Sequence, residues 1–298
     1  QPRLLDDSFK KLKGIIKSTL NSNAEYVVGI FPVAEETELH HFIIHRIKEM
    51  NKEWMTFLQD IANVTVLDFR ETDILYGIEE ILDPIKDKKG HMPFADEFYA
   101  AIGTEIARKI VAMKLPPFKV IAVDCDNTLW QGICGEDGVL GVKVDQFYGE
   151  LQRFLIQKLE EGMLIVLISK NNEADVWEVF DKNPEMILKK EHIAGYRINW
   201  QPKSQNIQEL AEELNLGLDS FIFIDDSGME TAEMVANKPE VLTVRVPEDP
   251  QKIPGFLKHN WAFDQFKLTE EDKKRTKLYL VEQERKQHQE TATSLESF

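Results

Sequence analysis

The chain of 298 residues has only two cysteines and no long apolar run. Cys125 and Cys134 are too few for a disulfide framework, so we expect both to be free thiols in a reducing compartment. A membrane-spanning helix needs about 18 or more consecutive apolar residues, and the sequence offers no such segment. The pattern of a secretory signal peptide is also missing at the N-terminus. These absences favour a cytoplasmic protein without a membrane partner.

Basic residues are also scarce. The 36 lysines and arginines face 52 aspartates and glutamates, which gives a formal net charge of -16. Duplex nucleic acids are bound through phosphate neutralisation by basic side chains, so this charge argues against a nucleic-acid partner. The acidic excess predicts solvated helix faces, and any anionic ligand must be held by a local cation. With 43% hydrophobic residues, the chain can bury a substantial core and has room for two domains.

The first part of the chain alternates between helical and extended patterns. In order, we expect a helix over residues 1–22, a strand over 26–33, helical material over 38–63, a strand over 64–68, a loop over 83–90 and a helix over 98–113. The run Leu115-Pro116-Pro117 then interrupts the chain, because proline ends regular structure. We therefore predict a small N-terminal α/β domain over residues 1–115.

A second alternating pattern follows the two prolines. The expected strands are 119–124, 163–169, 191–198, 220–224 and 241–246, and the expected helices are 145–161, 173–181, 203–214 and 228–236. Regular alternation of strand and helix predicts an α/β fold with a doubly wound parallel sheet, which we assign to residues 116–266. The charged remainder, residues 267–298, predicts an exposed helix and a tail.

The first strand of this second pattern carries the strongest functional signal. Its apolar run stops at Asp124-Cys125-Asp126, followed by Asn127 and Thr128. Parallel strands present their carboxyl ends to a ligand-binding crevice. Two carboxylates so close together raise one another's pKa unless a cation joins them, and oxygen ligands favour magnesium. We therefore predict a Mg2+ site at this strand end.

Three more strand ends offer polar side chains of complementary kinds. Ser169 and Asn171 follow the second apolar strand, and Lys203 stands at the start of a helix. Asp225 and Asp226 end the fourth strand. Together these positions supply a nucleophile, donors for an anion, a cation and metal ligands.

The order Asp-x-Asp-x-Thr, Ser, Lys and Asp-Asp at successive strand ends resembles the haloacid dehalogenase (HAD) superfamily of phosphoryl-transfer enzymes, over residues 119–246. The resemblance implies that Asp124 is the nucleophile and Asp126 the general acid and base. It implies that Thr128 orders the Asp126 loop. The phosphate-binding candidates are Asn127, Ser169, Asn171 and Lys203, and the candidate magnesium ligands are Asp124, Asp126, Asp225 and Asp226. Which of the last two aspartates binds the metal stays open.

A narrower resemblance rests on the residues that surround these motifs. Asp124-Cys125-Asp126-Asn127-Thr128-Leu129-Trp130, the glycine-rich segment 132–138 and Trp200 before Lys203 are similar to the FkbH-type glyceryl transferase/phosphatases of polyketide biosynthesis. That family implies 1,3-bisphosphoglycerate as donor, a glyceryl thioester on Cys125 and delivery to the phosphopantetheine thiol of an acyl carrier protein. Gly90-His91-Met92-Pro93-Phe94 resembles the last block of SGNH-type hydrolases. Its nucleophile block is missing, so we expect the N-terminal domain to be non-catalytic.

Two alternatives remain open on the residues themselves. Strand alternation turns a residue between two inward-facing aspartates away from the crevice, which would make Cys125 a small buried hydrophobe. The protein would then be a plain HAD-type phosphatase of a small phosphorylated metabolite. Trp130 and Trp200 could wall the pocket or pack beside the strand ends.

Overall fold

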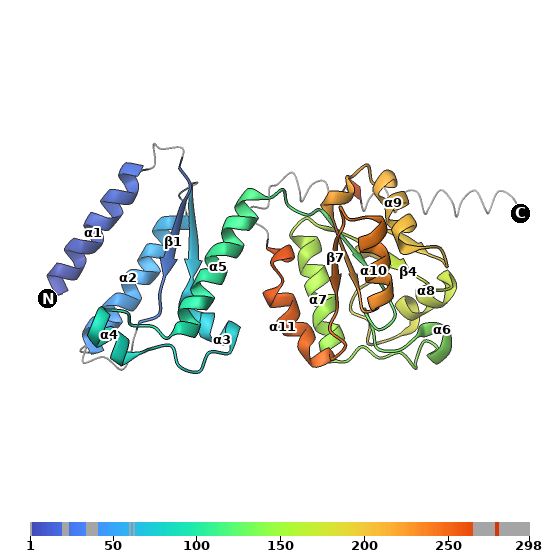
Figure 1. Ribbon diagram of the computed structural model, residues 1–298, viewed down its shortest axis with the longest axis horizontal. Helices are drawn as coiled ribbons and strands as arrows, with labels where there is room; N and C mark the ends of the chain where they lie inside the picture. Colours follow the sequence, from blue (N-terminus) through green and yellow to red (C-terminus); the bar gives the residue numbers. More distant parts are fainter. Residues whose placement is uncertain are drawn as a thin grey trace, which may run out of the picture. The chain divides into compact units, whose positions relative to one another are not determined.

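The structure is a computed structural model that describes residues 2–19, 24–33, 41–59, 61, 63–264 and 278–279. The chain divides into two compact units, Gln1–Ile110 and Val111–Phe298, which are described separately below (Figure 1). Within the described ranges, every helix is too short or too polar to cross a lipid bilayer.

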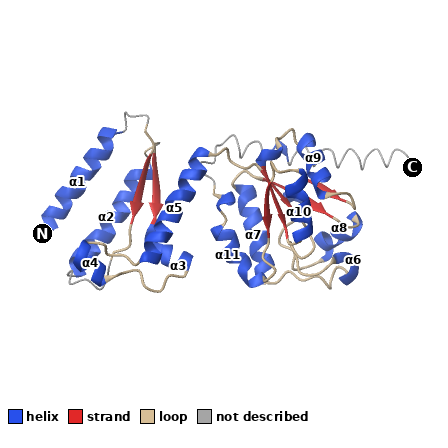
Figure 2. Ribbon diagram, viewed as in Figure 1, coloured by secondary structure: helices blue, strands red, loops and turns tan. Residues whose placement is uncertain are grey.

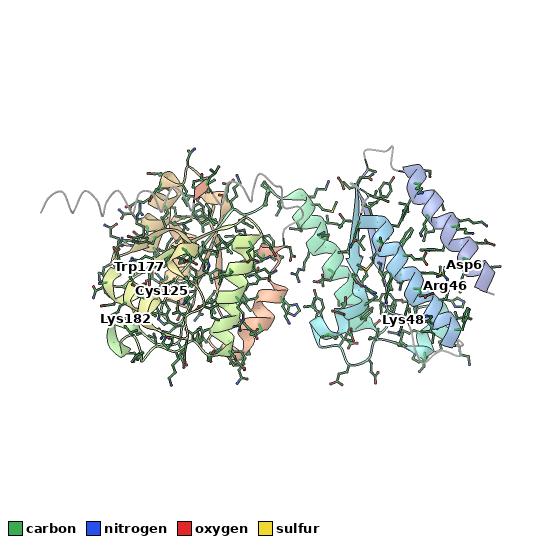
Figure 3. The ribbon with its side chains drawn as sticks, turned by 180° about the vertical axis from the view of Figure 1, so that it is seen from behind. Asp6, Arg46, Lys48, Cys125, Trp177 and Lys182 are labelled. Carbon is green, nitrogen blue, oxygen red and sulfur yellow. The ribbon has the colours of Figure 1, made fainter. Side chains whose placement is uncertain are left out.

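The N-terminal unit is a small α/β structure with two parallel strands. Its elements are α1 (Pro2–Thr19), β1 (Tyr26–Ile30), α2 (His41–Gln59), β2 (Val64–Asp68), α3 (Thr72–Tyr76), α4 (Pro84–Gly90) and α5 (Asp96–Lys114). Tyr26 lies opposite Val64 in the ladder. Trp54 and Leu58 of α2 bury their side chains with Ile30, so this helix covers the strand pair. Arg46 of α2 also binds Asp6 of α1 at 2.7 Å (Figure 3).

The loop predicted over residues 83–90 is wrong, because α4 occupies this stretch. Asp83 caps the helix, and its side chain accepts hydrogen bonds from the main-chain amides of Ile85 and Lys86 at 3.0 and 2.9 Å. Pro84 stands in the first turn, where its missing amide hydrogen is not needed. Asp83 and Pro84 therefore begin a helix rather than a loop. His91 ends the helix with a φ of 55°.

The C-terminal unit contains a five-stranded parallel sheet, which confirms the predicted fold class (Figure 2). Its strands are β3 (Val120–Val123), β4 (Leu164–Ser169), β5 (Ile193–Ile198), β6 (Phe221–Asp225) and β7 (Leu242–Arg245). They lie in the order β5-β4-β3-β6-β7. All four pairings are parallel, so the carboxyl ends of the strands meet at one edge.

Helices cover both faces of this sheet. One buried cluster joins alternate strand residues such as Ile121 and Val123 to α7 (Gln146–Glu160), α8 (Glu173–Lys182) and α11 (Ile253–His259). The other joins Val120 and Ala122 to α9 (Lys203–Glu213) and α10 (Gly228–Asn237). The alternation along β3 thus sends successive side chains into two separate cores. A four-residue helix, α6 (Cys134–Asp137), lies in the segment between β3 and α7.

The strand order reverses at β3. The chain passes from β3 to β4 and β5 on one side and returns to β6 on the other. In open α/β sheets, ligands bind at such a switch point beyond the carboxyl ends of the strands. The main-chain amide of Asp124 donates to the carbonyl of Ile224 at 3.0 Å, so the residues that end β3 and β6 are neighbours.

The helix and tail predicted over residues 267–298 lie outside the described residues, apart from Leu278 and Tyr279. The Tyr279 hydroxyl donates to the Leu214 carbonyl at 2.7 Å, at the C-terminus of α9.

Candidate active site

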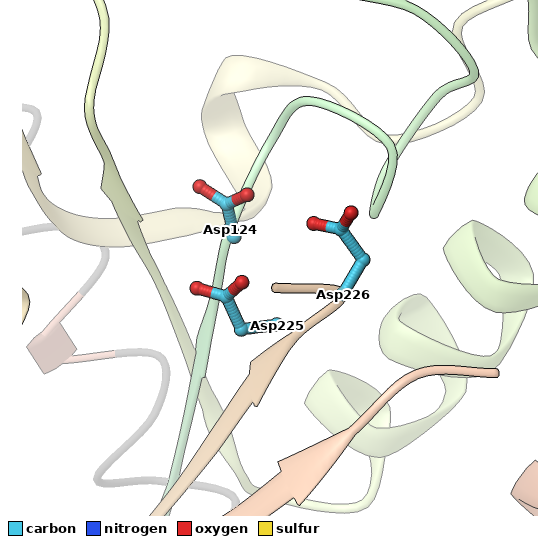
Figure 4. A group of neighbouring side chains, drawn as sticks. All are labelled: Asp124, Asp225 and Asp226. Atoms are coloured by element: carbon cyan, nitrogen blue, oxygen red, sulfur yellow. The ribbon is translucent and has the colours of Figure 1, made fainter. Parts of the chain in front are cut away.

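Three carboxylates converge at the switch point of the sheet. Asp124 follows β3, Asp225 ends β6 and Asp226 comes next, and Figure 4 shows their carboxylates turned toward a common space. Ligand oxygens from the three residues lie within 4.8 Å of one another. Asp124 and Asp225 are buried and Asp226 is half-buried. Parallel pairing of β3 with β6 is what brings these distant parts of the chain together.

Lys203, the first residue of α9, reaches into this cluster. Its Nζ lies 2.7 Å from Oδ1 of Asp124 and 2.6 Å from Oδ2 of Asp225, and the side chain is 3% exposed. Burial alone lowers the pKa of Lys203, but the two carboxylates outweigh it and the pKa is raised. The ammonium group therefore stays charged and fixes two of the three aspartates.

The two aspartates at the end of β6, Asp225 and Asp226, have different hydrogen-bond partners. Asp225 uses Oδ2 for Lys203 and accepts the main-chain amide of Ser227 on Oδ1 at 2.8 Å. Burial and the nearby Asp124 carboxylate raise the pKa of Asp225 to about 7, in spite of Lys203. Asp226 accepts a longer bond of 3.4 Å from the Thr128 hydroxyl, and burial followed by Asp124 raises its pKa as well. The Asp226 carboxylate therefore has a longer hydrogen bond to protein groups than the two that hold Asp225.

The donor set fits a hard divalent cation. Three carboxylates against one ammonium leave an excess of negative charge in a partly buried site, where burial first and the Asp124 carboxylate second raise the pKa values of Asp225 and Asp226. Oxygen donors and net negative charge are what Mg2+ prefers. The geometry therefore suits the predicted magnesium ion.

Asp126 was predicted as a fourth carboxylate ligand, but the structure does not place its carboxylate in this group of three. Its Oδ1 accepts the indole Nε1 of Trp130 at 2.9 Å and the main-chain amide of Cys134 at 3.0 Å. Its Oδ2 accepts Nδ2 of Asn171 at 2.9 Å. Three donors thus fix the orientation of the Asp126 side chain.

The predicted phosphate-binding residues separate into two groups. Ser169 is 1% exposed at the end of β4, and its hydroxyl accepts Nδ2 of Asn171 at 3.0 Å. These two residues lie on the same hydrogen-bonded path as Asp126. Asn127 instead forms the turn after the strand, with a φ of 54° and its Oδ1 bound to the amide of Gly132 at 3.0 Å. Its side-chain oxygen is occupied in the loop.

Cys125 points into the protein core. The side chain is fully buried, at 0% exposure, in the cluster that contains Leu129 and Trp130. It also contacts the Ser169 hydroxyl. Burial, and secondarily the Asp124 carboxylate, raise the pKa of the Cys125 thiol well above its usual range. At neutral pH the residue is a buried thiol rather than a thiolate.

The other cysteine is also buried. The Cys134 thiol donates to Oδ1 of Asn171 at 3.6 Å, and burial followed by Asp126 raises its pKa to about 12.

Sequence reasoning missed the groups that hold the site in place. Trp130 was considered as a pocket wall, but it is fully buried and donates to Asp126. A tryptophan four residues after a candidate acid is too common a pattern to assign this role. Arg245, the last residue of β7, donates from Nε to the Asp226 carbonyl at 2.9 Å, and no motif marks it.

Comparison with solved structures decides the fold family. The N-terminal part of the protein BF1531 of Bacteroides fragilis, which contains a phosphatase domain and was crystallised with Mg, matches with a TM-score of 0.75. The match covers 90% of this chain and 75% of that chain, at 24% sequence identity. The fold is HAD-like.

A HAD-family enzyme of Bacteroides thetaiotaomicron, solved with magnesium and inorganic phosphate, matches over 44% of this chain and 95% of its own. Its TM-score is 0.33 and its identity 14%. No protein-family model matches the sequence, and a search of curated proteins gives no match. At 24% identity, the likeness to the BF1531 fragment shows the fold alone, and the activity must be argued from the site itself.

Proposed function

We propose that this protein is a magnesium-dependent phosphatase of a small phosphorylated metabolite, with Asp124 as its nucleophile. The observation that carries the proposal is the buried cluster at the switch point. Asp124 and Lys203 lie 2.7 Å apart, and Asp225 and Asp226 complete a group of three carboxylates around one space. Such a group destabilises a protein unless it does chemistry or binds a cation. The crystal structure of the BF1531 fragment with Mg supports the same reading.

The residues divide the work in two steps. Lys203 holds Oδ1 of Asp124, so Oδ2 is the oxygen that attacks the phosphorus of the bound monoester. The bond between phosphorus and the ester oxygen breaks, and protonated Asp126 gives the leaving oxygen its proton. Water then attacks the aspartyl phosphate, Asp126 takes up a proton from it, and the bond to Asp124 breaks. Inorganic phosphate leaves, and both aspartates return to their starting states.

Fixed charge stabilises the phosphoryl group during both steps. Asp124 and Asp226 would hold the magnesium ion, and Lys203 holds Asp225 and the other side of Asp124 in place. Bound there, Mg2+ supplies positive charge opposite the phosphoryl oxygens. Lys203 and the Ser169 hydroxyl, both buried, contact the remaining oxygens without reorganisation.

The direct test is release of inorganic phosphate from a panel of small phosphate monoesters, with Mg2+ and with a chelator. Asp124→Asn keeps the shape of the side chain and removes the nucleophile, so we expect at least about a thousandfold loss of kcat. Asp181→Asn is the matched control. It also replaces an aspartate by asparagine, but Asp181 lies on α8 and forms an exposed ion pair with Lys190. If folded wild type with Mg2+ releases no phosphate, or if Asp124→Asn is as active as wild type, the proposal fails.

The second candidate is the carrier-dependent glyceryl transfer implied by the FkbH-type resemblance. One observation favours it: Cys125 stands between the two candidate catalytic aspartates in the sequence, and the nearby Ser169 hydroxyl acts to lower the pKa of its thiol. Its complete burial and raised pKa weigh against it, because attack on an acyl phosphate needs an accessible thiolate. The acyl carrier protein and 1,3-bisphosphoglycerate remain predictions that belong to this candidate.

A further inference from the structure

Trp200 exposes 70% of its side chain, in contrast to Trp130, which is fully buried. Tryptophan is large and apolar, and an exposed indole leaves much of its apolar surface in contact with water. This one is held in place, because its Nε1 donates to Oδ1 of Asn172 at 3.4 Å. The ring is therefore anchored by its polar edge and offers its apolar surface to solvent.

The main chain next to Trp200 is hydrogen-bonded to the end of β4, which carries Ser169. The amide of the preceding residue, Asn199, donates to the carbonyl of Ser169 at 3.1 Å. Lys203 follows three residues later, so the two Cα atoms are at most about 11 Å apart. The side chain of Asn199 also accepts the Gln201 amide at 3.0 Å, which fixes the turn on its other side. Trp200 thus stands on a rigid turn between the two side chains that would bind phosphate.

A second exposed apolar side chain borders the same strand ends. Met229, in the first turn of α10, is 79% exposed and follows Asp226 by three residues. The N-terminal part of α9 contacts α10, since the amide of Ser204 donates to Glu233 at 3.2 Å. The charged site therefore has apolar groups at the starts of two adjacent helices.

We propose that Trp200 is a specificity-determining residue that selects phosphate monoesters whose organic group is an aromatic or other planar ring. The inference rests on the proposed phosphatase function. In this proposal the phosphoryl group lies against Lys203 and Ser169, and the substituent on the ester oxygen lies toward the turn that carries the indole, which is hydrogen-bonded to the end of β4 through Asn199. A ring packs on the indole face and buries apolar surface there, whereas a polyol phosphate gains little from the same contact.

The test compares phenyl phosphate with glycerol phosphate in wild type, Trp200→Ala, Trp200→Phe and the control Val235→Ala. Val235 is a 55% exposed apolar residue near the other end of α10. We expect Trp200→Ala to lower kcat/KM for phenyl phosphate about three- to tenfold, mainly through KM, the range of one aromatic contact. Glycerol phosphate should change less than about twofold, and Trp200→Phe should restore most of the loss. Equal changes for both esters, or none for phenyl phosphate, overturn the inference.

A binding measurement separates this inference from the proposed function. If folded wild type hydrolyses neither ester, the full panel of monoesters decides on the phosphatase proposal, and calorimetry with phenylphosphonate and methylphosphonate in the presence of Mg2+ decides on the role of Trp200. Tighter binding of phenylphosphonate to wild type, with the preference lost in Trp200→Ala and kept in Val235→Ala, supports the role. Equal affinities for the two phosphonates in wild type, or a preference that survives in Trp200→Ala, refute it.

Discussion

Cys125 separates the two candidate activities at the scale of one residue. Its thiol is buried in the core beside Leu129, yet both its neighbours in sequence are candidate catalytic aspartates. If it only packs, Cys125→Ala should release phosphate at a rate within about twofold of wild type. Its free energy of unfolding should fall by about 0.5–3 kcal/mol, the usual range for a buried truncation. Phosphate release and chemical denaturation measure the two effects.

Intact-mass analysis after incubation with 1,3-bisphosphoglycerate and Mg2+ tests the opposite outcome. Glyceryl transfer requires an acyl adduct on wild type that disappears in Cys125→Ala and persists in Cys134→Ala. Cys134 is the matched control, because it is also a buried thiol near the site and its pKa is also raised. Observation of that pattern would replace the phosphatase proposal by the transferase.

At this scale, the sequence locates the groups but not their pairings. Asp124, Ser169 and Asp225 could be placed at one edge because parallel strands end together. The contact of Lys203 with two of the aspartates, and the diversion of Asp126 toward Trp130, depend on side-chain rotamers and loop packing. A residue spacing contains neither kind of information.

The helix α7 supports the site through one buried side chain. Gln152 is 0% exposed, and its Nε2 donates to the Leu129 carbonyl at 2.8 Å, in the segment that carries Asp126. Its Oε1 accepts the amides of Ile187 and Leu188, both at 2.9 Å. One glutamine therefore links α7, the loop after β3 and the approach to β5, and satisfies three main-chain groups.

We expect Gln152→Leu to lower the free energy of unfolding by about 2–5 kcal/mol, because it leaves three polar main-chain groups without partners. Gln157→Leu, an exposed position on the same helix, serves as control and should stay within about 0.5 kcal/mol of wild type. Urea denaturation of both variants measures the difference. Equal stabilities would show that the Gln152 contacts contribute nothing net.

The strands and long helices of the sheet unit could be predicted from periodicity because each buries a regular apolar face. The short helices could not. α4 buries none of its residues, and the capping bonds of Asp83 are what reveal it. α11, seven residues long, packs through Ile253 and Leu257, too few positions to establish a period. Elements of this length are defined by their tertiary contacts rather than by pattern.

At the scale of the whole molecule, the cluster of three carboxylates predicts how the free energy of unfolding depends on magnesium and pH. Asp225 has a pKa of about 7 in the folded metal-free protein, raised from an ordinary 3.8 chiefly by burial. Below the ordinary pKa both folded and unfolded states carry the proton, and this group has no effect. As the pH rises from about 4 to about 7, the unfolded chain releases the proton first, so folding stability declines over that window.

Magnesium binding should reverse this loss, because the ion needs deprotonated carboxylates and offsets their mutual repulsion. At saturating Mg2+, about a hundredfold above Kd, the gain is about 2.7 kcal/mol, or roughly 5–10 °C in Tm for a unit of this size. We expect nearly the full gain at about pH 7.5 and a much smaller one at about pH 5, where protons compete for Asp225. Scanning calorimetry with and without Mg2+ at the two pH values measures both.

The control variants identify the site responsible for this linkage. Asp226→Asn removes the carboxylate least committed to protein contacts and should abolish most of the magnesium-induced rise, whereas Asp181→Asn should keep it. A rise of equal size at both pH values would mean that the ion binds elsewhere than at the cluster of raised pKa. A rise that survives in Asp226→Asn would mean that the stabilising ion does not depend on the Asp226 carboxylate, which contradicts its assignment as a ligand.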